Sequence, residues 1–476
     1  MKKNTLKALR TLAFAIVTCA FFTQCSHDDV LPSYIRPIPT DSLDIPGDGA
    51  ASADTVPVGC ESCTYVVPAG VEVVDGEALG LKPGDVIGLS SEIKYGSIVF
   101  KNVVGSPDNP IVIRNCGGTA HIVATDRWHA IRTEYSKYFR ITGGEAKGVY
   151  GIRVEGGEMG MKLDGLSTNF EVDHVEVFNT GFAGIMAKTD PTCDDATIRG
   201  NFTMYDVALH HNYIHDVGGE GFYVGNSFWG GMERSCGNRL PHEIKNLKIH
   251  NNVLKNTGWE AIQVGCAIEG TEIFDNTIHN YGVANRPHQN NGIQIGSGTG
   301  GLVYNNLVKN GPGNGIIMMG IGDNVVYNNI IVDAGSNGIF ADERYTPGLG
   351  FMFINNTILS PKGDGIKLYT DEVEMNVVIN NIIANPGTLK NLSPDRAELA
   401  FVSASSSISL TKSNNIFAHT VDELHLVDPS ADNYRLKPTS PAVNFGKNIT
   451  RFTIEEDFYK NPRKKGFALD AGAAEY

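Results

Sequence analysis

The chain has 476 residues, of which 41% are apolar and 19% are charged, and its formal net charge is −14. That length allows two or three ordinary domains or one long repetitive domain, and the apolar fraction is ample for a core. A charge balance this acidic, with no basic stripe to offset it, argues against nucleic acid as a partner.

Residues 1–24 have the layout of an export signal. The segment MKKNTLKALR is basic, and TLAFAIVTCAFF is apolar but too short to span a bilayer comfortably. FTQC then places Cys25 where a bacterial lipoprotein is cleaved and lipidated. The next residues, CSHDD, resemble the acidic stretch that marks surface lipoproteins of the Bacteroidetes. We therefore expect an exported protein, held at the outer membrane and cell surface only by its lipid anchor. Ordinary secretion with cleavage nearby is the alternative.

Residues 25–60 are rich in Pro, Asp and Ser and show no periodicity, which predicts a flexible tether. Cys60 and Cys63 at its end form a lone C-x-x-C, for which a local disulfide or two free thiols are the expectations. Four further cysteines lack metal-ligand spacing, and most are predicted to be small buried residues: Cys116, Cys193, Cys236 and Cys266.

A repeat dominates the middle of the chain. Asn-Gly-Ile occurs at 291, 314 and 337, each 23 residues after the last. Each unit has a short alternating strand, an Asn or Asp, a four-residue turn and a second strand that opens with Gly-Ile or a similar pair. No helical segment separates the strands, which excludes a βαβ sheet. The pattern predicts an all-β fold, a single-stranded right-handed parallel β-helix, whose coils stack roughly 4.8 Å apart. We place this solenoid at 61–390, and its C-terminal coils and closing segment at 391–476.

Stacked coils align equivalent residues in columns. One apolar column is predicted to point inward and form the core: Ile185, Phe222, Ile262, Ile293, Ile316, Ile339 and Ile366. One polar column is predicted to lie at a turn: Asn179, Asp216, Asn256, Asn280, Asn310, Asp333, Ser360 and Asn385. Amides stacked in this way can hydrogen-bond along the column and satisfy turn backbone.

Over about residues 66–390 the chain resembles the pectate-lyase-like parallel β-helix superfamily. The opening LKPGDVIGL, GSPDNPIVIRNCGG and SKYFRITG, and the ending NYRLKPTSPAVNFG and DAGAAEY, carry the likeness, the ending being similar to Bacteroidetes members. The resemblance implies a polysaccharide lyase, a glycoside hydrolase or a uronate epimerase, and fold alone does not select among them. The hallmark motifs of polygalacturonases, the main pectate lyases and alginate epimerases are absent from the sequence.

Three long inserts interrupt the repeat, at 188–204, 226–243 and 342–350. Coils without inserts lie between them, so we expect a groove about three coils wide that suits an extended chain ligand. Strand alternation points Tyr223, Gln263 and Gln294 to its floor, next to Asn291. The predicted wall residues are Trp229, Arg234 and Arg344. In the alternative this is solvated surface, with Trp229 folded onto the coil beneath.

Two groups of residues are candidates for catalysis. Glu220 and Glu260 occupy equivalent places in adjacent coils, near the separation that retaining glycosidases use, and two close carboxylates would raise one pKa. The alternative is that both turn outward and never meet. A second group is basic: His215 and Lys255 stand in a ladder that continues through His279 and Lys309, and His288 lies in the segment before Asn291. A solvated ladder around the corner from the groove is the alternative.

Calcium could be bound by acidic loop residues such as Asp190, Asp194 and Asp195, but no ligand spacing demands it, and no metal site is assigned. We expect a monomer with a polysaccharide or oligosaccharide partner. The function hypothesis is an extracellular polysaccharide-processing enzyme, a lyase or a hydrolase. The alternative is a non-catalytic glycan-binding or structural surface protein, which the missing hallmark motifs favour.

Overall fold

The computed structural model describes residues 57–476 except 145–148, 322–323, 343–349, 370, 450–451 and 464–466. The predicted export signal, Cys25 and Arg344 therefore lie outside the described residues. Within the described part, no helix has the length and apolar character needed to cross a membrane.

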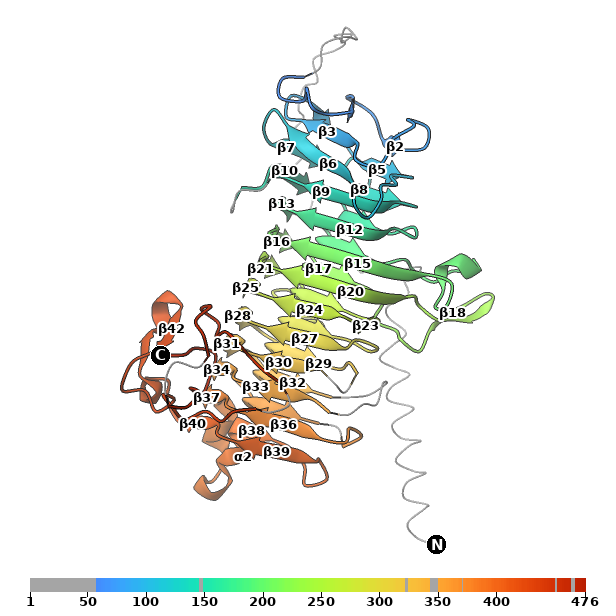
Figure 1. Ribbon diagram of the computed structural model, residues 1–476. Coiled ribbons are helices and arrows are strands. Elements are labelled where there is room, and N and C mark those ends of the chain that lie inside the picture. Colours follow the sequence, from blue (N-terminus) through green and yellow to red (C-terminus); the bar gives the residue numbers. More distant parts are fainter. Residues whose placement is uncertain are drawn as a thin grey trace. The chain divides into compact units, whose positions relative to one another are not determined.

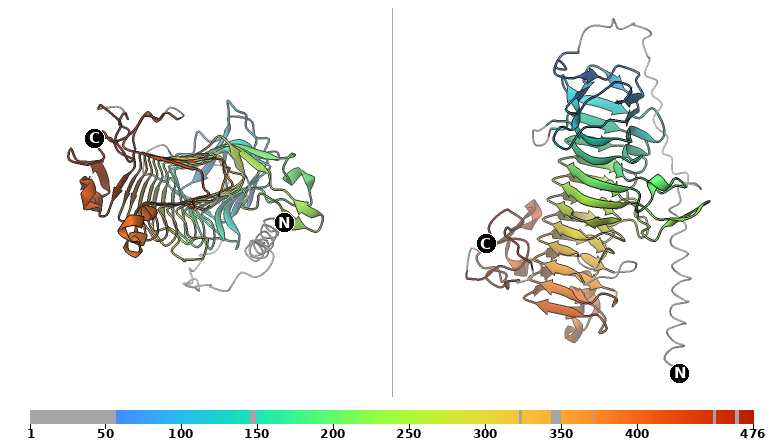
Figure 2. Two further views of the ribbon diagram at one scale, coloured as in Figure 1. Left: turned by 90° about the horizontal axis from the view of Figure 1, so that it is seen from below. Right: turned by 45° about the vertical axis from the view of Figure 1, so that its right-hand side comes forward.

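The described residues form three parallel sheets, and a complete coil between the two ends contributes one strand to each sheet, with β23 as an extra strand (Figure 1). We call them sheet I, sheet II and sheet III, in the order in which a coil such as β15, β16, β17 passes through them. Seen end-on, the coils superpose (Figure 2).

Sheet I has 14 strands among the described residues, with β23 paired beside β20: β1 Tyr65–Val66, β3 Val86–Ser90, β6 Ile111–Cys116, β9 Lys137–Thr142, β12 Thr168–Asp173, β15 Thr203–His210, β20 Glu243–His250, β23 Ala267–Glu269, β24 Thr271–Phe274, β27 Gly301–Tyr304, β30 Val325–Tyr327, β33 Met352–Ile354, β36 Asn376–Ile379 and β39 Leu410–Ser413. Sheet II has 12: β4 Lys94–Tyr95, β7 Ala120–Val123, β10 Ile152–Glu155, β13 Val175–Phe178, β16 Tyr213–Val217, β21 Val253–Thr257, β25 Thr277–His279, β28 Leu307–Gly311, β31 Ile330–Ala334, β34 Thr357–Leu359, β37 Ile382–Ala384 and β40 Ile416–Ala418. Sheet III also has 12: β2 Val73–Asp75, β5 Ile98–Lys101, β8 His129–Glu134, β11 Met159–Leu163, β14 Ile185–Ala187, β17 Phe222–Val224, β22 Ile262–Val264, β26 Ile293–Ile295, β29 Ile316–Met318, β32 Ile339–Ala341, β35 Ile366–Leu368 and β38 Val402–Ser403.

Outside these sheets lie the short helix α2 (Glu398–Phe401), the hairpin of β18 (Met232–Arg234) and β19 (Gly237–Arg239), and the hairpin of β41 (Leu426–Asp428) and β42 (Asn433–Leu436).

The predicted inward column is confirmed. Its seven residues are direct register partners in successive strands of sheet III, from Ile185 to Ile366, and none is exposed. In each of these three-residue strands the first and third side chains enter the core and the second points outward, as the strand period of two requires. The outward residues of sheet III are therefore also stacked in one column.

The turn from sheet I to sheet II holds a buried asparagine ladder. Each side-chain oxygen accepts hydrogen bonds from the backbone and side-chain amides of the preceding member, as between Asn306 and Asn329, both at 3.0 Å. The members are Asn212, Asn252, Asn276, Asn306, Asn329, Asn356, Asn381 and Asn415. The residue before each member has left-handed backbone, as Asn328 does at φ 54°.

The polar column that the sequence predicted lies at the next turn, from sheet II to sheet III. Its eight residues have left-handed backbone, and Asn256 bonds both Asp216 at 2.8 Å and Asn280 at 3.1 Å. These hydrogen bonds confirm the predicted stacking for part of this column. Its members are more exposed than those of the asparagine ladder. The buried ladder was not predicted.

We expect Asn329→Ala to destabilise the solenoid by about 3 kcal/mol, because it orphans the backbone amide of Asn306 and the carbonyl of Val303 in the interior. Asn310→Gly is the matched control, since it removes an exposed amide from the preceding coil and glycine accepts the left-handed backbone. Thermal unfolding midpoints measure both variants. Equal midpoints would contradict a stabilising role for the buried ladder.

The C-terminal segment covers the outer face of sheet II. Apolar side chains of sheet II such as Ile330 and Ile382 form a second buried cluster with Leu424, Tyr434 and Ala473 from this segment (Figure 1). The solenoid therefore has two cores, one inside the coils and one under its closing segment.

A disulfide joins Cys60 to Cys116 of β6, while Cys63 is a free thiol. The expectation of a local Cys60–Cys63 pair or two free thiols was therefore wrong, because stacking brings residue 116 next to residue 60. Cys266 is buried and free, as predicted.

Candidate functional site

The outer face of sheet III carries the residues predicted to form the groove floor. Tyr223, Gln263 and Gln294 are register partners in β17, β22 and β26, while the residues on either side of them lie in the core. Their outward direction is confirmed. However, they are only 8%, 4% and 7% exposed, so they do not form the open floor that was expected. Tyr223 packs with Phe182 in a small apolar cluster outside the sheet.

Amide side chains connect this column to the turn that precedes sheet III. Gln294 Nε2 donates to Gln263 Oε1 at 2.8 Å, and Asn291 Nδ2 lies 3.3 Å from Gln294 Oε1. Asn291 Nδ2 also lies 3.1 Å from Glu260 Oε1. The predicted residues Asn291, Gln263, Gln294 and Glu260 are thus brought together in one buried network.

The turn itself is a second amide ladder that two carboxyl groups extend. Asn291 Oδ1 accepts from Asn314, and Asn314 Oδ1 accepts from Asn337, through both backbone and side-chain amides. Glu260 and Glu220 occupy the same place in the two preceding coils, next to Ala261 and Gly221. Amides stack favourably here because each is both donor and acceptor, whereas adjacent carboxyl groups can bond one another only through a proton.

Both carboxyl groups are buried, Glu220 at 1% and Glu260 at 0% exposure. Burial, reinforced by the charge of Glu260, raises the pKa of Glu220 to about 8. Burial also raises the pKa of Glu260 to about 7, against the hydrogen bonds from its own amide and from Asn291. Glu220 Oε2 and Glu260 Oε2 have no hydrogen-bond partner. The pair therefore holds at least one proton at neutral pH, and the alternative in which both turn outward is wrong.

An ion pair whose buried lysine the sequence analysis did not single out lies beside them. Lys188 Nζ is 2.6 Å from Asp190 Oδ1 and stands 4.6 Å from the ring centroid of Tyr223. Burial opposes its charge, but Asp190 raises the pKa of Lys188 above its ordinary value, so the ammonium persists. Extending the outward column of sheet III upstream from Tyr223 also finds Lys162 and Arg132, both paired with Asp164. The register of the strands in sheet III was therefore the signal that could have pointed to Lys162 and Arg132.

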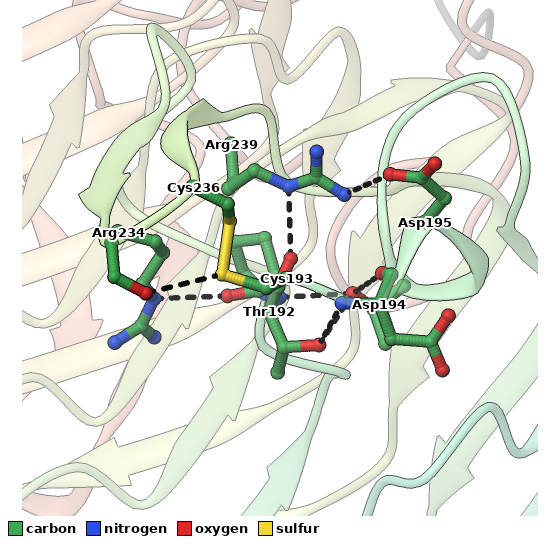
Figure 3. Close-up of a disulfide and its surroundings, with 10 residues drawn as sticks. Thr192, Cys193, Asp194, Asp195, Arg234, Cys236 and Arg239 are labelled. Atoms are coloured by element: carbon green, nitrogen blue, oxygen red, sulfur yellow. Dashed lines mark hydrogen bonds and ion pairs between the residues drawn. A yellow bond between two sulfur atoms is a disulfide. The ribbon is translucent and has the colours of Figure 1, made fainter.

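Two of the three predicted inserts are joined to each other. Cys193 of the insert 188–204 forms a disulfide with Cys236 of the insert 226–243, between β18 and β19 (Figure 3). Around it, Arg234 Nε donates to the Pro191 carbonyl at 3.1 Å and Arg239 Nε to the Thr192 carbonyl at 2.9 Å. The prediction that most of the four further cysteines are small buried residues was wrong, since Cys193 and Cys236 are exposed and are brought together by adjacent coils across 43 positions of sequence.

We expect Cys193→Ser/Cys236→Ser to raise the rate of proteolysis within 188–204 and 226–243 on the order of a hundredfold, since the crosslink contributes roughly 3 kcal/mol to loop order. Limited trypsin digestion with peptide mapping measures the rate. Cys63→Ser, which removes a free thiol elsewhere, should leave cleavage unchanged. Inserts that resist cleavage without the crosslink would show that packing alone holds them.

The predicted wall residues are engaged within the protein. Trp229 packs against Gly298, and the Arg199 guanidinium lies 3.4 Å from its ring centroid. Trp229 is therefore folded onto the protein, as in the alternative, but two coils further along, and is no free sugar platform. Arg234 holds the insert, as described above. The third insert, with Arg344, lies mostly outside the described residues.

Two of the three basic candidates lie in a different sheet from the one that follows the two carboxyl groups. His215 and Lys255 stand in sheet II, where His215 is bonded to Glu176 at 3.1 Å and Asp216 at 2.7 Å. They thus face a different side of the coil from Tyr223, around the corner from the expected groove. His288 is exposed and lies in the segment between β25 and β26.

The acidic residues considered for calcium are also engaged. Asp190 pairs with Lys188, Asp194 accepts from the Ala196 amide at 2.9 Å, and Asp195 pairs with Arg239 at 2.5 Å. These three carboxylates do not converge on a common point that would suit a cation.

Solved structures to which this chain is similar include two lyases and a lacto-N-biosidase. An alginate lyase from Paenibacillus sp. strain FPU-7 is 17% identical, over 63% of this chain and 98% of its own, with a TM-score of 0.41. A pectate lyase is 13% identical over 87% of this chain and 97% of its own, with a TM-score of 0.42. A lacto-N-biosidase from Eubacterium ramulus is 11% identical over 75% of this chain and 68% of its own, with a TM-score of 0.37. No curated protein matches the sequence.

The family described as "Right handed beta helix region" matches residues 241–421. That span covers the coils from β20 to β40, which include Glu260, Gln263 and Gln294. The family match and the three stacked parallel sheets together identify the chain as a right-handed parallel β-helix protein.

Proposed function

We propose that this protein cleaves a polysaccharide on the outer face of sheet III, between the coils of Lys188 and Gln294. The observation that carries the proposal is the pair of buried carboxyl groups, Glu220 and Glu260, whose pKa values of about 8 and 7 keep a proton available at neutral pH. Hydrolysis and elimination both need a proton donor for the departing glycosidic oxygen. An exposed carboxyl group with an ordinary pKa would be ionised and could not supply it.

In this proposal Glu220, with the higher pKa, donates the proton, and Glu260 accepts one from water or from the sugar. Gln263, Gln294 and Asn291 supply donors and acceptors for sugar hydroxyl groups. Lys188 places a fixed positive charge at one end of the column, where an anionic sugar or a developing negative charge would be stabilised. Tyr223 lies between Lys188 and the amide side chains, and presents its ring and its hydroxyl group to the sugar.

The substrate must reach carboxyl groups that are closed to solvent. Arg286 lies over Trp259, 4.1 Å from the ring centroid, and its charge acts on both Glu220 and Glu260. The segment that carries Arg286 leads into sheet III at Asn291, which donates to Glu260. We expect its side chains to be displaced by a sugar that enters the site.

A second candidate function is non-catalytic glycan binding. The observation that favours it is that Glu220 and Glu260 continue a structural amide ladder and are fully buried. In that case the two residues position the turn, and the polar column serves only to hold a glycan.

The two functions are separated by incubating the protein with neutral and uronic-acid polysaccharides, with and without calcium. Ultraviolet absorbance follows the unsaturated product of elimination, and reducing ends are measured in parallel. Reducing ends without absorbance would indicate hydrolysis, and both signals together elimination. Retention of a glycan in an affinity gel without either signal would overturn the catalytic proposal in favour of binding.

A further inference from the structure

Three cysteines meet at the N-terminal end of the described solenoid. Cys60 and Cys116 form a disulfide, and Cys63 carries a free thiol three residues after Cys60. The Cys63 amide donates to the Cys60 carbonyl at 2.9 Å, so the chain turns back on itself between these two residues. The free thiol is thus held in the same turn as one half of the disulfide.

Gly88 in β3 provides the space in which two of these sulfur atoms lie. Its neighbours Ile87 and Leu89 enter the core, so Gly88 faces the outside of sheet I. A Cβ atom on Gly88 would stand 2.7 Å from Cys63 Sγ and 3.1 Å from Cys116 Sγ. Both sulfur atoms therefore lie within 3.1 Å of one point, which makes the free thiol a direct neighbour of the disulfide.

A second contact keeps the turn that carries Cys63 over this strand. Arg114 of β6 is the register partner of Gly88, and its guanidinium donates to the Ser62 hydroxyl. Glycine weakens the interior of a strand, and it often marks a place where another segment approaches closely. In β3 the segment that approaches is the turn with Cys63.

The three sulfur atoms differ in their access to solvent. Cys60 is 0% and Cys116 5% exposed, whereas Cys63 is partly exposed. The rate of thiol–disulfide exchange depends on which thiol can reach the disulfide. The fold keeps an external thiol away from the buried bond, but Cys63 already lies beside it. Cys63 is therefore the attacking thiol that this geometry favours.

We propose that Cys63 exchanges with this disulfide, so that the crosslink to Cys116 moves between Cys60 and Cys63. The Cys63 thiol loses its proton to water, and the thiolate attacks Cys116 Sγ. The bond between Cys116 and Cys60 breaks, and Cys60 leaves as a thiolate that takes up a proton. Each side of the reaction has one disulfide and one thiol, so neither an oxidant nor a reductant is consumed.

The exchange changes the anchor of the N-terminal segment. The loops that the two pairings close differ by only three residues, against a separation of 56 between Cys60 and Cys116, so chain entropy does not select one of them. When Cys63 holds the crosslink, the residues before it lose their covalent attachment to β6. The predicted tether then gains a reach of roughly 10 Å, the extended length of three residues.

The test is a map of the crosslink in the full-length protein. The protein is incubated at pH 8.5, where a larger thiolate fraction speeds exchange, and is then unfolded at pH 6.5 in excess N-ethylmaleimide, which blocks every free thiol. A glutamate-specific protease cuts after Glu61 and so separates Cys60 from Cys63. Mass spectrometry without reduction should find both crosslinks, with maleimide on Cys60 in at least about one tenth of the molecules.

Cys63→Ser is the matched control, because it removes only the attacking thiol, and it should leave Cys60 without label. Gly88→Ala keeps all three cysteines but places a methyl group between the sulfur atoms, and should lower the label on Cys60 at least about fivefold. The Cys193–Cys236 crosslink is the internal control and should stay unchanged in every sample.

Cys60→Ser supplies a second readout that does not depend on the rate of exchange. When it is folded in a glutathione redox buffer, this variant should join Cys63 to Cys116 within one molecule. The proposal is overturned if Cys60 of the wild type is never labelled. It is also overturned if Cys60→Ser leaves Cys63 and Cys116 as free thiols or joins Cys63 to a second molecule. These readouts involve no polysaccharide, so they are independent of the proposed function.

Discussion

Glu260→Gln is expected to lower the turnover of polysaccharide at pH 7 by at least a hundredfold while raising the stability of the fold at pH 8. Glutamine keeps the hydrogen bond with Asn291 but cannot gain or lose a proton, so general acid–base chemistry is lost. Glycan binding should remain, because Gln263, Gln294 and Lys188 are untouched. The opposite effects on activity and stability come from one cause, the burial of an ionisable carboxyl group.

The sign of the stability effect follows from linkage. The pKa of Glu260 is raised by burial from 4.5 to about 7, so the folded state holds its proton more tightly than the unfolded chain does. Its favourable contribution is complete below pH 4.5 and is lost as the pH rises through 7, a change of about 3 kcal/mol. Glu220, raised to about 8, adds a loss of the same sign over a wider range. The wild type should therefore become less stable between pH 4.5 and 8.

Unfolding midpoints at pH 5 and pH 8 measure this effect. The difference between the two midpoints should shrink in Glu260→Gln and shrink further when Glu220→Gln is added. Glu92→Gln is the control, since Glu92 is exposed and its loss should leave the pH profile as it was. A Glu260→Gln variant whose midpoints keep the wild-type difference would show that Glu260 is not protonated in the fold.

The same two groups set an expected pH dependence of activity. If Glu220 must be protonated and Glu260 ionised, the rate should rise to about pH 7 and fall above about pH 8. Adjacent carboxyl groups titrate as a pair, so the two limbs belong to the pair and not to one residue each.

The coil architecture could be predicted because the repeat and the strand period constrain each other. Spacing of 23 residues fixes which residues stack, and alternation then decides that Ile293 and Ile316 enter the core while Gln294 points outward. The same logic predicted that Glu220 and Glu260 occupy equivalent places. Had the outward column been followed upstream of Tyr223, Lys162 and Arg132 would also have been found.

Burial was the part that the repeat could not predict. Tyr223 and Gln263 point outward yet are covered, because their surroundings depend on how the inserts and neighbouring loops fold. In each Asn-Asn pair, such as Asn328 and Asn329, the two residues look alike in sequence. Only the backbone turn shows that the second is buried in the ladder, and the first is left to bond other segments, as Asn328 does with the Glu456 carbonyl at 2.8 Å. The Cys193–Cys236 disulfide was missed for a related reason, since it joins two loops that have no repeat.

Arg463→Met is expected to destabilise the attachment of the closing segment by about 3–5 kcal/mol. The guanidinium is only 2% exposed; it donates to Glu475 at 3.1 Å and to the Gly472 carbonyl at 2.9 Å, and also contacts Asn328. Removing it leaves the Glu475 carboxylate buried without its cation, which is the costly way to break a buried ion pair. The closing segment would then release the apolar outer face of sheet II, including Ile330 and Ile382.

The release should be seen as hydrogen exchange that rises in residues 452–463 and 467–476 and in strands β31 and β37, while the strands of sheet III stay protected. Adding Glu475→Gln to Arg463→Met should recover much of the loss, because it removes the uncompensated charge. Lys437→Met, which removes an exposed cation from the same segment, is the matched control. Equal exchange in Arg463→Met and Lys437→Met would mean that apolar packing alone holds the closing segment. Protection of sheet III in the released state would show that the candidate site does not depend on the second core.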